Sequence, residues 1–347
     1  MDVQSSVKRF DEAVHALPER IKQAVVSVPD SIKKSATEVR LRVNQPVSLC
    51  CMGKTYFVSE KHKAIESPHG CFPVTREDLA QSVISMCAYS VHSHQHELSQ
   101  GYISLKGGHR AGICGTASSD NGKVTAVRDI TSINIRIARE IHSAAASLTN
   151  TAFAKGLCGT LIVGAPSSGK TTILRDLARR MSSGEATGCY IKTAVVDERG
   201  ELGAVFEGIP QNNLGICCDI LSGYPKGFGI LTAVRTLSPD VIICDEIGGK
   251  EETVSILDGI GCGVKIIAAA HAGSLRELLS RRHIHRLLEA GAFEKIVMLK
   301  NGSTPGVISE IVEVGELCLE TDGVNCNHPV LHHDRNVHVG KFIQKSL

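Results

Sequence analysis

Tryptophan is absent from the sequence, and aromatic residues make up only 4% of its 347 positions. Stacking platforms for nucleic-acid bases need exposed aromatic faces, so this scarcity argues against binding of single strands by stacking. The formal net charge of +2 is also too small to attract a polyanion over the whole surface. We therefore expect that nucleic acid is not a partner.

The sequence also lacks any run of about 20 apolar residues, the length that a membrane-spanning helix needs. Its first residues mix acidic and basic side chains where a signal peptide would be apolar. The 13 cysteines never occur in a CxxC spacing, which favours reduced, mostly buried thiols over a disulfide framework or a zinc site. We expect a soluble chain that is not exported.

With 42% hydrophobic and 21% charged residues, the composition is that of an ordinary globular protein. The first part reads as a small α+β domain, with an amphipathic helix over 6–28 and a capping box formed by Thr75 and Asp78. Alternating apolar residues predict strands over 38–43 and 133–139, and a pair of strands within 101–115 joined through Gly107 and Gly108.

The residue pattern of the sequence changes after residues 142–156. These residues are small and polar, and we interpret them as a linking helix. Beyond them, apolar segments alternate with helical stretches, the pattern of a mostly parallel sheet flanked by helices. The fold class is therefore α/β, preceded by the smaller α+β domain. The predicted units are an N-terminal domain over 1–141, the linker over 142–156, the α/β domain over 157–322 and a loosely ordered tail over 323–347. Within the α/β domain the expected strands are 160–163, 193–196, 241–244 and 265–269, followed by a hairpin of 294–300 and 307–313.

A glycine-rich loop follows the first of these strands and precedes a helix, in the pattern GxxxxGK[ST] of a phosphate-binding P-loop. Backbone N–H groups of such a loop and the helix N-terminus bind phosphate oxygens. Lys170 is expected to reach the β- and γ-phosphates of ATP, and the Thr171 hydroxyl to bind Mg²⁺. The predicted nucleotide-binding residues are Gly164, Ala165, Pro166, Ser167, Ser168, Gly169, Lys170, Thr171 and Thr172.

Asp245 and Glu246 follow the buried strand 241–244, at the sheet edge where ligands of open α/β sheets bind. We assign Asp245 to Mg²⁺ and Glu246 to the general base that activates water. The alternative is an acidic pair that only faces solvent.

Two further groups follow apolar strands and would reach the same edge. Glu198 is a candidate for polarising water or for binding Mg²⁺ through water; the alternative is a surface loop in which Arg199 pairs with it. His271 is a candidate sensor of the γ-phosphate; the alternative is a structural histidine. His92, His94 and His96 would share one side of a strand, but with only Glu97 nearby a metal site is not expected.

With these residues in place, the chain resembles the stage III sporulation protein AA family, relatives of the type II and type IV secretion ATPases. The likeness is carried by segments 38–46, 93–95, 106–115, 133–140, 169–179, 196–202 and 238–247. It implies a RecA-like ATPase domain behind a smaller N-terminal domain, with ATP and Mg²⁺ bound between the two and subunits assembled into a hexameric ring. One departure is the strand end, where this chain has Asp245-Glu246-Ile-Gly-Gly and the secretion ATPases usually have Gly-Glu-Ile-Arg-Asp.

The resemblance also places Asp197 and Glu198 in an acidic cluster and His271 in a histidine motif. It implies that arginines of the N-terminal domain cover the phosphates, for which Arg110, Arg136 and Arg139 are the candidates; the alternative is that they only support that domain's fold. It further implies a protein at the cytoplasmic face of a membrane, on the mother-cell side of the forespore, recruited by a membrane-anchored partner and powering a secretion-like channel.

Two other functions remain possible at this stage. A nucleic-acid-dependent RecA-like ATPase would share the core fold, although the charge and aromatic content disfavour it. A small-molecule kinase would use the same loop, but such kinases usually carry the P-loop near the N-terminus.

Overall fold

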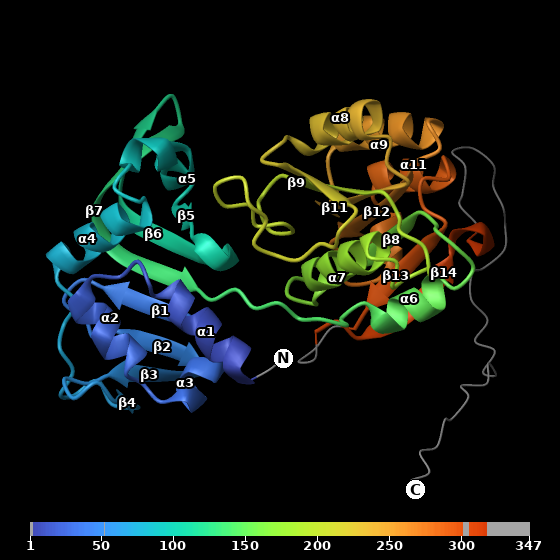
Figure 1. Cartoon of the computed structure of the whole chain (residues 1–347). Helices are drawn as coiled ribbons and strands as arrows, with labels where there is room; N and C mark the ends of the chain where they lie inside the picture. The colour runs from blue at the N-terminus through green and yellow to red at the C-terminus, as the bar shows by residue number, and fades with distance from the viewer. Residues whose placement is uncertain (1–2, 52, 301–304, 318–347) are drawn as a thin grey trace, which may run out of the picture.

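The structure, a computed structural model, describes residues 3–51, 53–300 and 305–317. Its two sheets form separate bodies joined by a connecting segment (Figure 1). The expected tail over 323–347 lies outside the described residues. The helix α6 (Ala146–Ala152) lies within the stretch where the sequence predicted a linking helix, but it packs on the second sheet; the domain boundaries themselves remain predictions.

The first sheet has the strand order β4-β3-β2-β1-β7-β6-β5, and all its neighbours are antiparallel. Its strands are β1 (Ala36–Arg42), β2 (Ser48–Cys51), β3 (Lys54–Val58), β4 (Ala64–Ile65), β5 (Tyr102–Ser104), β6 (Arg110–Asp120) and β7 (Lys123–Arg136). Its helices are α1 (Val3–Ala13), α2 (Glu19–Val26), α3 (Asp30–Ser35), α4 (Arg76–Met86) and α5 (Gln95–Ser99), with short 3₁₀ turns η1 (Val91–His94) and η2 (Lys106–Gly108).

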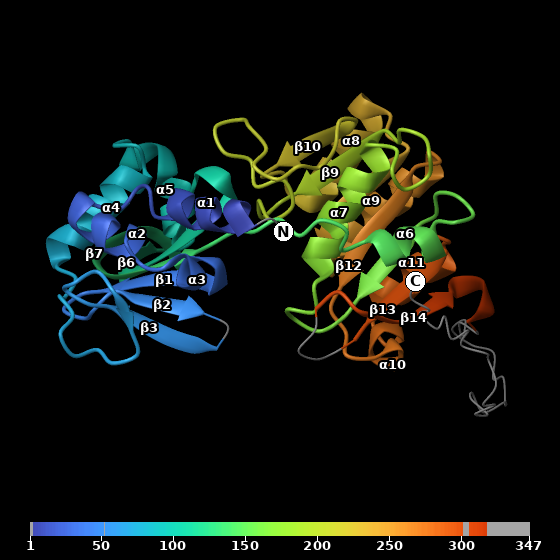
Figure 2. The same ribbon diagram turned by 60° about the horizontal axis from the view of Figure 1, so that its bottom comes forward.

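The helices of this first body cover one face of its sheet and leave the other face open (Figure 2). Phe10 and Ile21 from the helices pack with Val39, Leu41 and Ile135 from the strands in one buried cluster. The intervening strand residues, which are polar or charged, therefore point to the open face.

The single helix expected over 6–28 is wrong, because the chain forms two helices there. Pro18 caps α2 with φ −54°, and a proline has no N–H to donate within a helix and restricts the residue before it. The capping box of α4 is confirmed, since Thr75 accepts from the Asp78 N–H and Asp78 accepts from the Thr75 N–H. The strand expected over 133–139 ends at Arg136.

The second sheet has the order β10-β9-β11-β12-β8-β13-β14, parallel throughout except for β14. Its strands are β8 (Thr160–Val163), β9 (Thr193–Asp197), β10 (Cys218–Ser222), β11 (Val241–Glu246), β12 (Lys265–Ala270), β13 (Lys295–Leu299) and β14 (Ile308–Glu313). Its helices are α7 (Lys170–Ser182), α8 (Lys226–Leu237), α9 (Lys250–Gly261), α10 (Leu275–Leu279) and α11 (Arg282–Glu289), followed by the 3₁₀ turn η3 (Val314–Glu316).

Helices cover both faces of this sheet, as expected (Figure 1). On one face α6 and α7 bury Leu148, Ile173 and Leu177 against the strands, and on the other α8, α9 and α11 bury Ile230, Ile256 and others. The four apolar strands and the closing hairpin are confirmed. The strand β10 was not predicted, because its Cys218–Ser222 sequence has only two aliphatic residues.

Candidate active site

The candidate site lies at the carboxyl edge of the second sheet, where four parallel strands end beside one another. The loop after β8 begins at Gly164, β11 ends at Glu246, β12 is followed by His271 and β9 by Glu198. Because β8 and β11 both pair with β12, and β9 pairs with β11, the ends of these strands are brought to one edge.

The P-loop conformation explains its two glycines. A Cβ on Gly164 would lie 2.5 Å from Ser168 Oγ, and one on Gly169 would lie 2.7 Å from the Gly306 nitrogen. Gly169 also has φ +95°, the region that glycine adopts without steric cost. The loop therefore runs directly into the N-terminus of α7, which favours an anion there.

Ser168 supports the assignment of this loop to phosphate. Its hydroxyl oxygen is buried without a hydrogen-bond partner among the described residues, a state that costs free energy until a partner arrives. The hydroxyl of Thr171 and the carboxylate of Asp245 form an all-oxygen donor set, which is the chemistry that Mg²⁺ prefers. The residues present thus fit a nucleotide with its Mg²⁺.

Lys170 is connected to the candidate base through His271. The ammonium Nζ lies 2.8 Å from both the Gly164 and Ala165 carbonyl oxygens and 3.1 Å from His271 Nδ1. On the other side of the imidazole, Nε2 lies 3.2 Å from Glu246 Oε2. Burial lowers the pKa of Lys170, against the opposing effects of Glu246 and Asp245.

This chain of contacts fixes the tautomer of His271. An ammonium can only donate, so Nδ1 accepts from Lys170, and Nε2 therefore carries the proton that faces the Glu246 carboxylate. Moving the proton to Nδ1, toward the Gly164 carbonyl oxygen at 3.3 Å, would turn the Nε2 lone pair against that carboxylate. His271 is therefore the donor that orients Glu246.

A β-bulge lies at the end of β11. The register with β12 shifts between Cys244 and Glu246, so Asp245 is the extra residue. In a regular strand, neighbouring side chains point to opposite faces, whereas a bulge changes the direction of a side chain. The charges of Glu246 and Asp245 both oppose the lowering of the Lys170 pKa by burial.

The two acids at the end of β9 have different surroundings. Asp197 is fully buried and accepts hydrogen bonds from the backbone N–H groups of Glu201, Leu202 and Gly203. Asp197 therefore organises the turn. The Glu198 side chain is 40% exposed and lies 3.8 Å from Lys226 Nζ, so its cationic partner is Lys226 and not Arg199, the partner in the alternative interpretation.

Arg110 is the one expected arginine that approaches this edge. Its guanidinium stacks 3.5 Å over the Tyr102 ring and lies 3.9 Å from Glu201 Oε1, across the two bodies. Burial and the charge of Asp245 raise the pKa of Glu201, while Arg110 opposes the shift. Arg110 of the first sheet therefore contacts the second body through Glu201, near the carboxyl edge of the second sheet.

The expectation that Arg139 covers the phosphates is wrong for this structure. Its guanidinium donates to the backbone carbonyl oxygens of Lys33, Lys34 and Ala36, all within the first body. Arg136 lies on β7, in register with Arg110 of β6 and Glu38 of β1, and its side chain is exposed. Arg139 thus supports the fold, whereas Arg136 shares the open sheet face with Arg110.

Three polar residues near the site were not singled out from the sequence. Glu201 contacts Arg110, as described. Arg175 of α7 donates to the Glu201 carbonyl oxygen at 2.8 Å, and Lys226 is buried among carboxylates. Arg175 lies one helical turn beyond the P-loop, at a position that the GxxxxGK[ST] motif does not specify. Lys226 belongs to no motif that could be recognised in the sequence.

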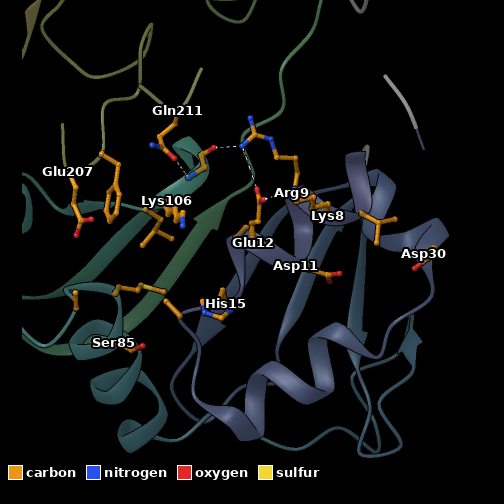
Figure 3. A pocket seen from close by; sticks show the side chains of 18 residues that line it. Lys8, Arg9, Asp11, Glu12, His15, Asp30, Ser85, Lys106, Glu207 and Gln211 are labelled. Carbon is orange, nitrogen blue, oxygen red and sulfur yellow. Dashed lines mark hydrogen bonds and ion pairs between the residues drawn. The ribbon is translucent and has the colours of Figure 1, made fainter. Parts of the chain in front are cut away.

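Other features lie away from this edge. The segment with His92, His94 and His96 forms η1 and the start of α5 and not a strand, and His94 Nδ1 pairs with Glu97 at 2.9 Å. A cavity of about 930 Å³ lies between α1 and the 206–211 loop, with Arg9 and Gln211 both bonded to Gly107 beside it (Figure 3). Its lining side chains carry both charge signs, and none of the P-loop residues is among them.

The family model for sporulation stage III, protein AA matches residues 8–316. The chain belongs to the stage III sporulation protein AA family. It is 36% identical over 315 residues to stage III sporulation protein AA of Bacillus subtilis (strain 168), covering 90% of this chain and 99% of that one.

The fold resembles those of the ATPase DotB and the pilus retraction motor PilT. The ATPase DotB of Yersinia pseudotuberculosis has a TM-score of 0.52 and 15% identity, covering 86% of this chain and 80% of its own. The pilus retraction motor PilT, solved with ADP, has a TM-score of 0.50 and 14% identity, covering 81% and 76%. These likenesses establish the fold, a RecA-like P-loop domain. None of the helices in the described part of the chain is long and apolar enough to cross a membrane.

Proposed function

We propose that this chain is an ATP-hydrolysing motor of the secretion type that acts during endospore formation. The observation that carries the proposal is the continuous contact from Lys170 through His271 to Glu246, at the sheet edge where the P-loop ends. It joins the group expected at the phosphates to the carboxylate expected to activate water. Family membership supports the sporulation role.

Each residue then has a task derived from its position. Glu246 accepts the proton of the attacking water, and His271 holds its carboxylate through the Nε2 proton. Thr171 and Asp245 would hold Mg²⁺, which when bound neutralises phosphate charge. The three ammonium hydrogens of Lys170 already donate to Gly164, Ala165 and His271. Lys170 must therefore break one of these hydrogen bonds when it donates to a phosphate.

Arg110 extends the site to the first body. We propose that this guanidinium, which stacks on Tyr102 and faces Glu201, stabilises charge on a transferred phosphoryl group. We propose that the chain works as a homo-oligomeric, hexameric ring. We further propose that a membrane-anchored partner recruits it to the cytoplasmic face of the membrane around the forespore, on the mother-cell side.

Phosphate release measured together with light scattering tests the proposal. The wild-type chain should release phosphate from Mg²⁺-ATP, and its activity per protomer should rise with concentration as rings form. Lys170→Ala should abolish release, since it removes the cation at the phosphates. Flat activity per protomer from dilute monomer to concentrated sample would contradict the ring, and release by Lys170→Ala would contradict the site.

A further inference from the structure

Lys226 is the first residue of α8, and its side chain is only 7% exposed. Its ammonium donates to the backbone carbonyl oxygen of Glu246, and lies 3.8 Å from Glu198 Oε2 and 3.6 Å from Glu252 Oε1. One buried cation therefore meets the end of β11, the loop after β9 and the first turn of α9.

The position of Lys226 is unfavourable unless it has these partners. A cation in the first turn of a helix opposes the helix dipole, and a buried ammonium without partners is costly. The start of α8 packs closely against α9, because a Cβ on Gly227 would lie 2.8 Å from Ser255 Oγ of α9. This packing brings Lys226 close to Glu252. Glu252 is itself fixed, since its Oε2 accepts from the Gly248 and Gly249 N–H groups at 2.7 and 2.8 Å.

The contact with Glu246 is to its backbone, at the point where the strand loses support. The ladder between β11 and β9 ends at the Cys244–Val196 pair, two residues before Glu246. The bulge at Asp245 also interrupts the ladder with β12. Beyond Cys244, β9 no longer pairs with β11. Lys226 donates to the Glu246 carbonyl oxygen there and so holds the last residue of β11.

We infer that Lys226 is a positioning residue for hydrolysis. It fixes the peptide that carries Glu246, and it holds Glu198 toward the same strand end by charge. The inference rests on the proposed function, and it assigns Lys226 no contact with nucleotide. Holding a base within hydrogen-bond reach of water affects the chemical step, whereas nucleotide affinity depends on the P-loop.

The test compares Lys226→Met, which removes the charge but keeps the length, with Lys226→Arg and with Lys250→Met. Lys250 is exposed, lies at the start of α9 and lines the same surface groove as Lys226, so it is the matched control. Lys226→Met should lower kcat by about 10-fold or more, while KM and the affinity for a fluorescent ATP analogue change by less than about two-fold. Lys226→Arg should regain part of kcat, and Lys250→Met should match the wild type.

A folded Lys226→Met protein with wild-type kcat overturns the inference. Should that variant fail to fold, the double variant Lys226→Met/Glu252→Gln removes one anion with the cation; its kcat must still be low, and a normal kcat overturns the inference. If the wild type binds nucleotide but releases no phosphate, the proposed function fails separately. In that case the free energy of unfolding in urea tests the contacts of Lys226. The loss caused by Lys226→Met must be smaller in a Glu252→Gln protein than in the wild type, and equal losses in the two proteins overturn the inference.

Discussion

Lys170 Nζ and His271 Nδ1 lie 3.1 Å apart, and His271 is the single acceptor of Lys170 in the described chain that is not a P-loop carbonyl. The imidazole therefore links the phosphate-binding loop to Glu246 on β11. A change in the position of Lys170 removes one of the contacts that hold the ring. We therefore expect the orientation of Glu246 to depend on whether the P-loop holds a phosphate group.

Replacing His271 by alanine should separate binding from hydrolysis. The variant keeps the loop amides and Lys170, so nucleotide affinity should stay close to that of the wild type. Turnover should fall by about 10-fold or more, because Glu246 loses the donor that orients it. His69→Ala, at an exposed position in the first body, is the control. A parallel loss of binding and turnover would assign His271 a structural role.

Glu246 and Glu198 can be distinguished as bases by amide substitution. Glu246→Gln keeps the shape and the contact distance to His271 but cannot accept a proton, so it should bind ATP and hydrolyse it about 100-fold more slowly or worse. Glu198→Gln should lose less, because its carboxylate lies against Lys226 and contacts neither His271 nor Lys170 through any interaction seen in the described residues. Phosphate release at saturating ATP ranks the two. The reverse ranking would make Glu198 the base.

Except for β10, the parallel strands were predictable because they are apolar runs such as Val241–Cys244, whose burial on both faces leaves a clear sequence pattern. The P-loop was predictable from its glycines, which backbone geometry requires at Gly164 and Gly169. Periodicity failed at residues 6–28, since it records which side is apolar and not where the helix axis breaks; Pro18 was the relevant signal.

The arrangement at the sheet edge was only partly predictable. Glu246 and His271 each follow an apolar strand, which predicts that they lie at one edge of the sheet. The contact between them also depends on the bulge in β11, which no residue type in the sequence indicates. The arginines illustrate the same limit. Arg110 and Arg139 both stand in alternating, apolar stretches, yet one meets Glu201 and the other meets three carbonyl oxygens, because tertiary packing decides the partner.

Arg110 and Arg139 should consequently respond in opposite ways to substitution by methionine. Arg139→Met leaves three backbone carbonyl oxygens without their donor, which should cost about 3 kcal/mol and lower Tm by roughly 6–10 °C. Its activity per folded molecule should stay near the wild-type value. Arg110→Met should leave Tm almost unchanged and reduce turnover by about 10-fold.

Thermal unfolding and phosphate release on the same samples provide the comparison. Arg128→Met, a change on the exposed part of β6 and β7 where Arg128 bonds Ser118, controls for the loss of any arginine. A stable Arg139→Met protein with reduced turnover would return that residue to the site. A destabilised Arg110→Met protein with normal specific activity would remove Arg110 from it.

His109 should make the first body sensitive to acid. The ring is 1% exposed, its Nδ1 accepts from the Ala138 N–H at 2.9 Å and its Nε2 has no partner in the described chain. Burial, followed by the charges of Arg9 and Arg139, lowers the pKa of His109 to about 4. In the unfolded chain the pKa returns to about 6.5.

Between these two values the unfolded state binds more protons than the folded state, so the free energy of unfolding rises with pH across the window and is lost as pH falls through it. From pH 7.5 to pH 5 the loss attributable to His109 should be about 2 kcal/mol. His109→Gln removes the titration, so urea unfolding should give it a smaller difference between the two pH values than the wild type, even though its stability at pH 7.5 is lower. His69→Gln should keep the wild-type difference, because His69 is exposed. An equal pH dependence in His109→Gln and the wild type would show that the buried imidazole is not what acid attacks.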